Sequence, residues 1–213
     1  MLYYDKQVTQ STEIYIWKVE EDFNELATLS GCDSDTDYRV LNEKRKKEWA
    51  CVRYLLFRNY PDLIICYQAS GKPYLKDKKK DKNNKVPSIS ISHTSDYVSI
   101  MLNKDHKDIG LDIEKRKNSR VLNVADRFMS EKERAEKPTN DDTINALLVW
   151  TAKEALYKLA DIKYIDYIKD FHIENINIYK GTGNGIITEL INGNTYKVNF
   201  SIEPEFVMAW IEN

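Results

Sequence analysis

The chain has 213 residues, of which 32 are basic and 34 acidic, giving a formal net charge of -2. A dedicated nucleic-acid binder carries a marked basic excess, so this balance argues against that class. Basic residues do cluster at 44–47 and 76–85, which suits the binding of a small phosphorylated ligand. Apolar residues make up 42%, and with 7 glycines and 5 prolines the chain is neither collagen-like nor disordered.

The cysteines and the apolar pattern indicate the compartment. Cys32, Cys51 and Cys66 form no CxxC motif, which fits a reducing cytosol better than a disulfide framework. The first residues lack the apolar core of a signal peptide, and no run reaches the roughly 18 apolar residues that span a bilayer. We therefore expect a cytoplasmic protein with no membrane partner.

Three stretches show helical patterns. Residues from about 38 to 59 lack Gly and Pro and place apolar side chains at helical spacing. A second helical region is predicted from Val121, and Ser130 followed by Glu133 has the spacing of a capping box. The clearest helix is predicted at 141–159. Alternating runs rich in β-formers predict strands at 13–19, 88–92, 97–102, 108–114, 176–179, 185–191, 195–201 and 206–211.

A faint internal repeat in the sequence suggests how these elements are organised. Ser92 precedes a Tyr-Val pair by five residues, and Ser201 precedes a Phe-Val pair by the same distance. Trp49 and Trp150 each lie four residues before a charged residue on a predicted helix. We therefore predict an α+β fold of two similar α/β lobes, 1–105 and 106–213, related by a pseudo-twofold, with the active site in the cleft between them.

Paired carboxylates mark a candidate metal site. Residues two apart on a strand point to the same face, so Asp112 and Glu114 project together. Two adjacent oxygen ligands suit Mg²⁺ bound jointly with a phosphate. Glu154 and Lys158 share a helix face with Trp150, a composition that suits a cleft wall. The alternatives are two solvated acids at a strand end and a surface ion pair.

Two turns carry further polar groups. His93 follows a predicted strand within Ser-Ile-Ser-His-Thr-Ser, which offers several hydrogen-bond donors to a phosphate. A predicted turn at 70–73 holds Lys72 and Pro73 beside an aromatic ring, and the lysine-rich stretch 76–85 after it is predicted to be a solvated loop. A lone histidine is more often structural, and a Gly-Lys-Pro turn is common.

The order of these motifs is more specific than any one of them. Gly-Lys-Pro-Tyr, Ser-His-Thr, Gly-Leu-Asp-Ile-Glu, Phe-Met-Ser-x2-Glu and Trp-x2-Lys-Glu-x3-Lys follow one another from Gly71 to Lys158. In this order they resemble the 4'-phosphopantetheinyl transferase superfamily, in particular its larger, two-lobed (surfactin-pathway-like) class. Two features depart from that family: Ser90 stands where it often has Asn, and the insertion at 76–85 is longer than usual.

The resemblance implies an enzyme of the holo-[acyl-carrier-protein] synthase type. It would transfer the 4'-phosphopantetheine arm of coenzyme A to a serine of an apo acyl or peptidyl carrier protein and release 3',5'-ADP. Asp112, Glu114 and Glu154 would hold Mg²⁺, with Mn²⁺ as the alternative ion. Glu154 would remove the serine proton, directly or through a water on the metal, with Lys158 beside the phosphates.

Further roles follow from the same resemblance. The residues implied for coenzyme A binding are Arg45, Arg53, Lys72, Pro73, Ser92, His93 and Lys158. Phe128 and Glu133 match a segment near the carrier-docking side, although Glu133 is equally well explained as a capping residue. We expect a monomer without a nucleic-acid partner. The rival hypotheses are a metal-dependent phosphodiesterase or nuclease and a non-catalytic carrier-binding module.

Overall fold

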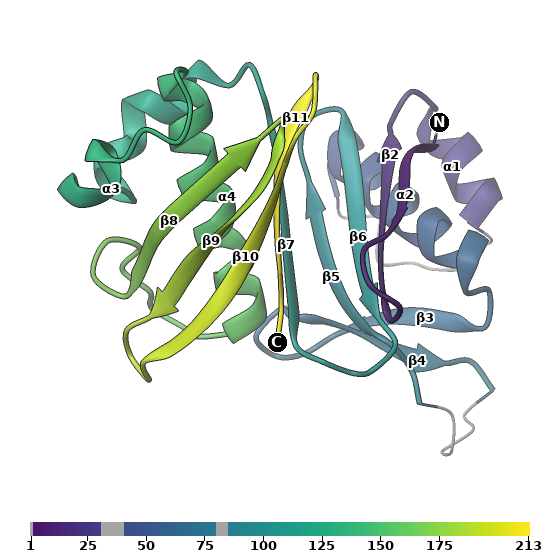
Figure 1. Cartoon of the computed structure of the whole chain (residues 1–213). Coiled ribbons are helices and arrows are strands. Elements are labelled where there is room, and N and C mark those ends of the chain that lie inside the picture. The colour runs from purple at the N-terminus through teal and green to yellow at the C-terminus, as the bar shows by residue number, and fades with distance from the viewer. Residues whose placement is uncertain (1, 31–40, 80–84) are drawn as a thin grey trace. The chain divides into compact units, whose positions relative to one another are not determined.

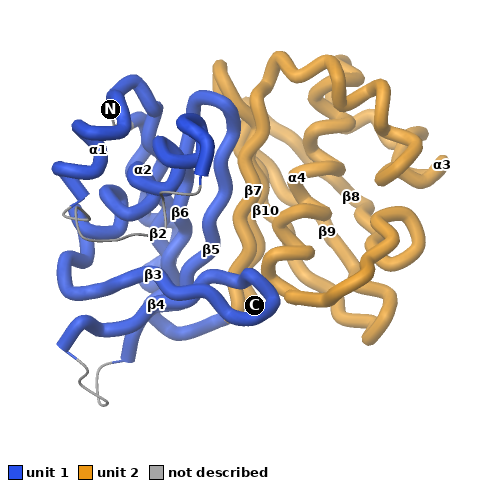
Figure 2. Tube along the Cα trace, turned by 180° about the vertical axis from the view of Figure 1, so that it is seen from behind, with its two compact units in different colours: residues 1–107 blue, residues 108–213 orange. Residues whose placement is uncertain are grey.

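The computed structural model describes residues 2–30, 41–79 and 85–213. The fold is α+β, and the chain divides into two compact units, Met1–Lys107 and Asp108–Asn213 (Figure 2). The sequence-based boundary after residue 105 lies two residues earlier. No helix in the described ranges is both long and apolar enough to cross a bilayer.

The first unit contains an antiparallel sheet with strand order β1-β2-β6-β5 and a separate β3-β4 hairpin. Helix α2 packs against β2, β3 and β6, and its buried residues join the strands in one apolar core. The Asn42 side chain caps α2 by accepting from the amide of Arg45. The elements are β1 (Leu2–Gln7), β2 (Thr12–Lys18), α1 (Phe23–Ser30), α2 (Glu43–Asn59), β3 (Leu63–Tyr67), β4 (Pro73–Asp77), β5 (Ser88–His93) and β6 (Tyr97–Asn103).

The second unit is a five-stranded antiparallel sheet with order β7-β11-β10-β9-β8. Helix α4 packs across this sheet, against β7, β11, β8 and β9 (Figure 1). The elements are β7 (Ile109–Lys115), the 3-10 helix η2 (Ser119–Arg127), α3 (Glu131–Ala135), α4 (Asp142–Ala160), β8 (Phe171–Tyr179), β9 (Thr182–Glu189), β10 (Asn194–Ile202) and β11 (Phe206–Glu212).

The close contact between α4 and β7 depends on a glycine. A Cβ atom on Gly110 would lie 1.9 Å from the carbonyl oxygen of Ala155, a backbone atom of α4. Only glycine allows the helix to approach the strand this closely. Asp112 and Glu114 follow Gly110 at intervals of two along β7, so all three positions belong to the face of the strand that meets α4.

The two units share part of their topology. In the first, β6 lies between β2 and β5, and in the second, β11 lies between β7 and β10. All these pairs are antiparallel, and one long helix packs on each sheet. This common three-strand order agrees with the internal repeat between the Ser92 and Ser201 segments, whereas the pseudo-twofold relation between the units stays a prediction.

Several predicted boundaries were wrong. Strand β8 begins at Phe171 rather than 176, because the chain continues through an irregularity in pairing between Glu174 and Asn177. The region after Val121 is a 3-10 helix that begins at Ser119, and β9 ends at Glu189. Strands β1, β3 and β4 and helix α1 were not predicted. The proposed helical start near residue 38 and residues 80–84 of the lysine-rich stretch fall outside the described residues, and the first two residues of that stretch belong to strand β4 rather than to a loop.

Candidate active site

The three predicted metal-ligating carboxylates all lie in the second unit, near enough for their charges to act on one another. Asp112 and Glu114 project from β7, and Glu154 projects from the middle of α4. Each carboxylate has a hydrogen-bond donor. Lys158 donates to Asp112 Oδ1 at 2.7 Å, the Trp150 indole to Glu114 Oε1 at 3.0 Å, and the Tyr167 hydroxyl to Glu154 Oε1 at 2.6 Å.

The helix face shared by Trp150, Glu154 and Lys158 is turned toward the acids of β7, since Trp150 and Lys158 both donate to them. All three side chains lie at the β7–α4 contact, so Glu154 and Lys158 are not a simple surface ion pair. The Asp112 side chain is only 7% exposed and that of its partner Lys158 is 26% exposed. Lys158 also donates to the carbonyl of Leu111 at 3.0 Å, which holds its ammonium group against β7.

The electrostatics of the cluster favour a cation. Burial raises the pKa of Glu114, and the nearby charge of Asp112 raises it further. Burial also raises the pKa of Glu154, which the Tyr167 hydrogen bond opposes and the charge of Asp112 reinforces. The negative charges of these carboxylates repel one another, the Lys158 ammonium group offsets part of that repulsion, and a divalent ion would relieve it further.

The donor set fits Mg²⁺ in its chemistry. Carboxylate oxygens are the protein ligands that Mg²⁺ uses, with substrate phosphates and waters completing its shell. Nonetheless, the side chains of the described residues are not drawn together as a preformed metal cluster of three or more His, Cys, Asp or Glu groups. One oxygen of each carboxylate instead receives a protein donor, as described above.

In the first unit, Arg45 and His93 lie together. An Arg45 guanidinium nitrogen is 2.6 Å from His93 Nε2, and because arginine cannot accept, Nε2 is the acceptor. Glu48, with its side chain 8% exposed, accepts from Arg45 at 3.0 Å and lies 3.6 Å from His93 Nδ1. Glu48 therefore anchors Arg45, and its other carboxylate oxygen lies near His93 without a hydrogen bond to it.

The other predicted coenzyme A residues of this unit are more dispersed. Arg53 stacks on the Trp49 ring, with its guanidinium carbon 3.6 Å from the ring centroid. Lys72 lies in the turn before β4, where Gly71 has a φ of +93°, and Pro73 starts that strand. Ser92 is buried in β5, and its carbonyl accepts from the Ser99 hydroxyl at 3.0 Å.

The two predicted docking residues are buried. Phe128 is 2% exposed and packs against the Trp150 ring at 5.0 Å between centroids. Glu133 is also 2% exposed and forms the capping box with Ser130 at the start of α3. Its carboxylate also pairs with Lys153, so the capping interpretation describes its contacts, and the docking role stays a prediction.

Sequence reasoning missed Lys153, Tyr167 and Glu48. Tyr167 lies in the segment between α4 and β8, where no periodic pattern marks it. Lys153 is next to Glu154 in the sequence, but lysine is almost never fully buried, so composition gave no reason to place it in the interior. For Glu48, the only available signal was its position three residues after Arg45.

Carboxylates near a lysine also occur in metal-dependent enzymes that act on phosphates. The family model of the 4'-phosphopantetheinyl transferase superfamily matches residues 108–210. The match covers almost all of the second unit, a little under half of the chain, and includes Asp112, Glu114, Glu154 and Lys158. It supports a transferase and phosphopantetheine transfer in general terms. No curated protein matches the chain.

Proposed function

We propose that this chain transfers the 4'-phosphopantetheine arm of coenzyme A to a serine hydroxyl of an apo carrier protein. What supports the proposal is that Asp112, Glu114 and Glu154 affect one another's charge, that Lys158 donates to Asp112, and that all four lie within the segment that matches the superfamily. The like-charge repulsion among these acids is a cost to the fold that a cation-binding function accounts for.

Each residue has a defined role in this proposal. Asp112, Glu114 and Glu154 would hold Mg²⁺, which when bound neutralises charge on the pyrophosphate of coenzyme A. Lys158 places a positive charge beside Asp112 that complements the charge on the leaving group. Trp150 fixes one oxygen of Glu114 and so orients that carboxylate.

The transfer step balances without a further reactant. The serine oxygen attacks the phosphorus that bears the pantetheine arm, and the phosphoanhydride P–O bond breaks. The 3',5'-ADP leaves with the bonding electron pair. Glu154 would take the serine proton as the general base.

Arg45 and His93 would bind phosphate groups of coenzyme A. The guanidinium fork of Arg45 matches phosphate oxygens, and Glu48 holds it ready on the first turn of α2. Arg53, Lys72, Pro73 and Ser92 belong to the same proposed surface by resemblance. The proposal has four further parts. They are membership of the larger two-lobed class, activity of the holo-[acyl-carrier-protein] synthase type, a monomeric state and a cytoplasmic location.

The proposal is tested by incubating the protein with coenzyme A, Mg²⁺ and a panel of apo acyl and peptidyl carriers. At least one carrier should gain the mass of one phosphopantetheine arm, and its serine-to-alanine variant should gain none. Carrier binding without a mass gain would favour the non-catalytic module. Cleavage of DNA or of a phosphodiester, without transfer, would favour the rival hydrolase.

The variant Glu154→Gln tests the assigned base and metal ligand. It should nearly abolish transfer and leave the far-UV and near-UV circular dichroism spectra unchanged, because it alters one charge and no volume. Turnover equal to that of the wild type would contradict the role given to Glu154.

A further inference from the structure

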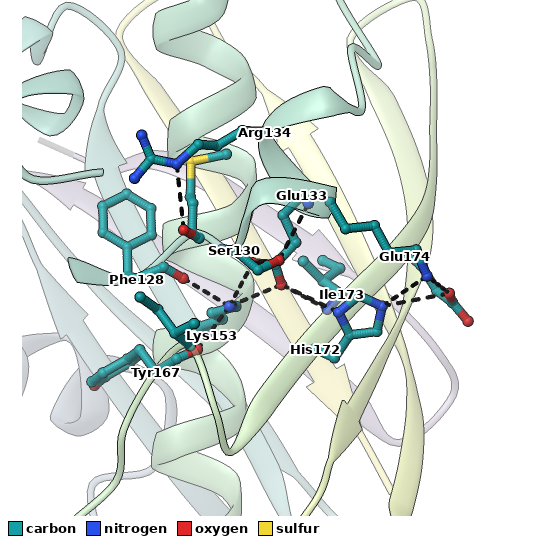
Figure 3. A network of polar contacts seen from close by, with 12 residues as sticks. Phe128, Ser130, Glu133, Arg134, Lys153, Tyr167, His172, Ile173 and Glu174 are labelled. Atoms are coloured by element: carbon teal, nitrogen blue, oxygen red, sulfur yellow. Dashed lines mark hydrogen bonds and ion pairs between the residues drawn. The ribbon is translucent and has the colours of Figure 1, made fainter. Parts of the chain in front are cut away.

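A buried lysine lies beside Glu154 and has no role in the proposed chemistry. Lys153 has a side chain with 0% exposure, and its ammonium group has three acceptors. It donates to the carbonyls of Phe128 and Tyr167, both at 2.7 Å, and to Glu133 Oε2 at 2.9 Å (Figure 3). An ammonium group has three protons to donate, and these three acceptors use all of them.

The partner of Lys153 is itself firmly anchored. Glu133 accepts from the backbone amides of Ser130 at 2.8 Å and Ile173 at 3.0 Å. The first amide begins α3 and the second lies in β8, so the buried ion pair ties α4 to both elements (Figure 3). The buried ion pair can therefore also fix the segment between α4 and β8, which contains Tyr167.

Tyr167 connects this anchor to Glu154. The backbone carbonyl of Tyr167 accepts from Lys153, and the Tyr167 hydroxyl donates to Glu154 Oε1 at 2.6 Å. Between these two ends, the ring lies 5.4 Å from the Trp150 ring and 5.8 Å, edge-on, from the Phe171 ring. Backbone, ring and hydroxyl are therefore all restrained, and the direction of the hydroxyl is set before any ligand binds.

We propose that Tyr167 is a positioning residue for Glu154 and that Lys153 holds Tyr167 in the required place. A glutamate side chain has several rotatable bonds, so one fixed oxygen removes most of its freedom and leaves Oε2 for the reaction. This inference rests on the proposed function, since it assigns a purpose to the orientation of Glu154. It concerns orientation and does not require Tyr167 to lose its proton.

The first test compares Tyr167→Phe with Tyr157→Phe. Tyr157 is a matched control because it is on α4, its ring centre is 6.2 Å from that of Tyr167, and it is 40% exposed. Removing the hydrogen-bond partner of a metal-binding carboxylate typically costs 10–100-fold in affinity or activity. For Tyr167→Phe we expect kcat at saturating Mg²⁺ to fall about 10-fold, with KM for coenzyme A unchanged.

A second readout does not depend on turnover. The dissociation constant of Mn²⁺ in the presence of coenzyme A is measured from the electron paramagnetic resonance signal of the free ion. Tyr167→Phe should weaken Mn²⁺ binding about 10-fold, and Tyr157→Phe should leave it unchanged. Equal Mn²⁺ affinity and equal kcat in wild type and Tyr167→Phe would overturn the positioning role, even if the wild type is an active transferase.

The role of Lys153 is tested with the paired change Lys153→Gln and Glu133→Gln, which leaves no unpaired buried charge. If Lys153 acts through Tyr167, the pair should lower kcat as Tyr167→Phe does, and all three changes together should lower it no further. Multiplied losses would overturn the coupling. If the paired variant does not fold, hydrogen exchange of wild-type residues 161–170 decides: protection like that of α4 supports the anchor, and exchange within seconds contradicts it.

The outcomes separate this inference from the proposed function. If the wild type transfers phosphopantetheine and both Tyr167→Phe and Tyr157→Phe match it in kcat and Mn²⁺ affinity, the positioning role alone is overturned. A wild type that neither transfers the arm nor binds Mn²⁺ overturns the proposed function and the positioning role with it.

Discussion

Substitution of Gly110 by alanine tests how the close approach of β7 and α4 builds the site. The added Cβ would lie 1.9 Å from the Ala155 carbonyl oxygen, whereas ordinary contacts begin at 3.4 Å. The strand and the helix must therefore separate by about 1.5 Å, because the obstructing atom is backbone and cannot rotate away. Glu154 directly precedes Ala155, so the same movement displaces it from Asp112 and Glu114.

The expected magnitudes follow from this displacement. Overpacking of this kind costs about 1–3 kcal/mol in the free energy of unfolding. For a chain of this size, each kcal/mol lowers Tm by roughly 2–4 °C. Because a misplacement of about 1 Å at a reacting centre can cost about 100-fold in rate, we expect Gly110→Ala to lower kcat about 100-fold.

The assay combines urea unfolding with transfer kinetics, and Gly185→Ala is the matched control. Gly185 lies in β9 of the same sheet, where the nearest atom to an added Cβ is a side-chain carbon of Ile176 at 3.3 Å. That side chain can yield, so the control should retain kcat and most of its stability. Wild-type stability and kcat in Gly110→Ala would refute the argument that glycine sets the β7–α4 distance.

Two further predictions concern buried charges. Lys153→Met should destabilise the protein by about 3–5 kcal/mol in urea unfolding, because Glu133 is left buried without its cation; a loss below 1 kcal/mol would contradict this. Glu114 and Glu154 have folded-state pKa values raised above the 4.5 of an ordinary glutamate, so their stabilising contribution is present below pH 4.5 and is lost as pH rises through the folded-state values. Mg²⁺ should therefore raise Tm more at pH 8 than at pH 5, and Glu114→Gln should reduce the difference; an equal shift at both pH values would contradict the prediction.

Much of the candidate site could be predicted from periodicity. The two-residue spacing of a strand places Asp112 and Glu114 on one face, and the four-residue spacing of a helix aligns Trp150, Glu154 and Lys158. The structure adds which partners meet: Lys158 with Asp112, and Trp150 with Glu114. These pairings depend on the register of β7 against α4, which periodicity within one element does not determine.

The remaining parts of the site depend on tertiary contacts. Tyr167 reaches Glu154 from a segment without regular secondary structure, and Lys153 is buried only because Glu133 and two carbonyls converge on it. The role of Gly110 likewise appears only when the helix is placed over the strand. Strand β1 was missed because its charged residues hide the alternation, and β8 was shortened because its pairing is irregular near Asn175.

The central claim is that this chain moves an intact phosphopantetheine arm from coenzyme A to a carrier serine. The most direct measurement is the intact mass of an apo carrier and the amount of 3',5'-ADP, both followed in one reaction with Mg²⁺. We predict one arm gained for each 3',5'-ADP released, and neither product when a chelator removes the metal. Release of 3',5'-ADP without any mass gain on the carrier, or no reaction with any acyl or peptidyl carrier, would contradict the claim.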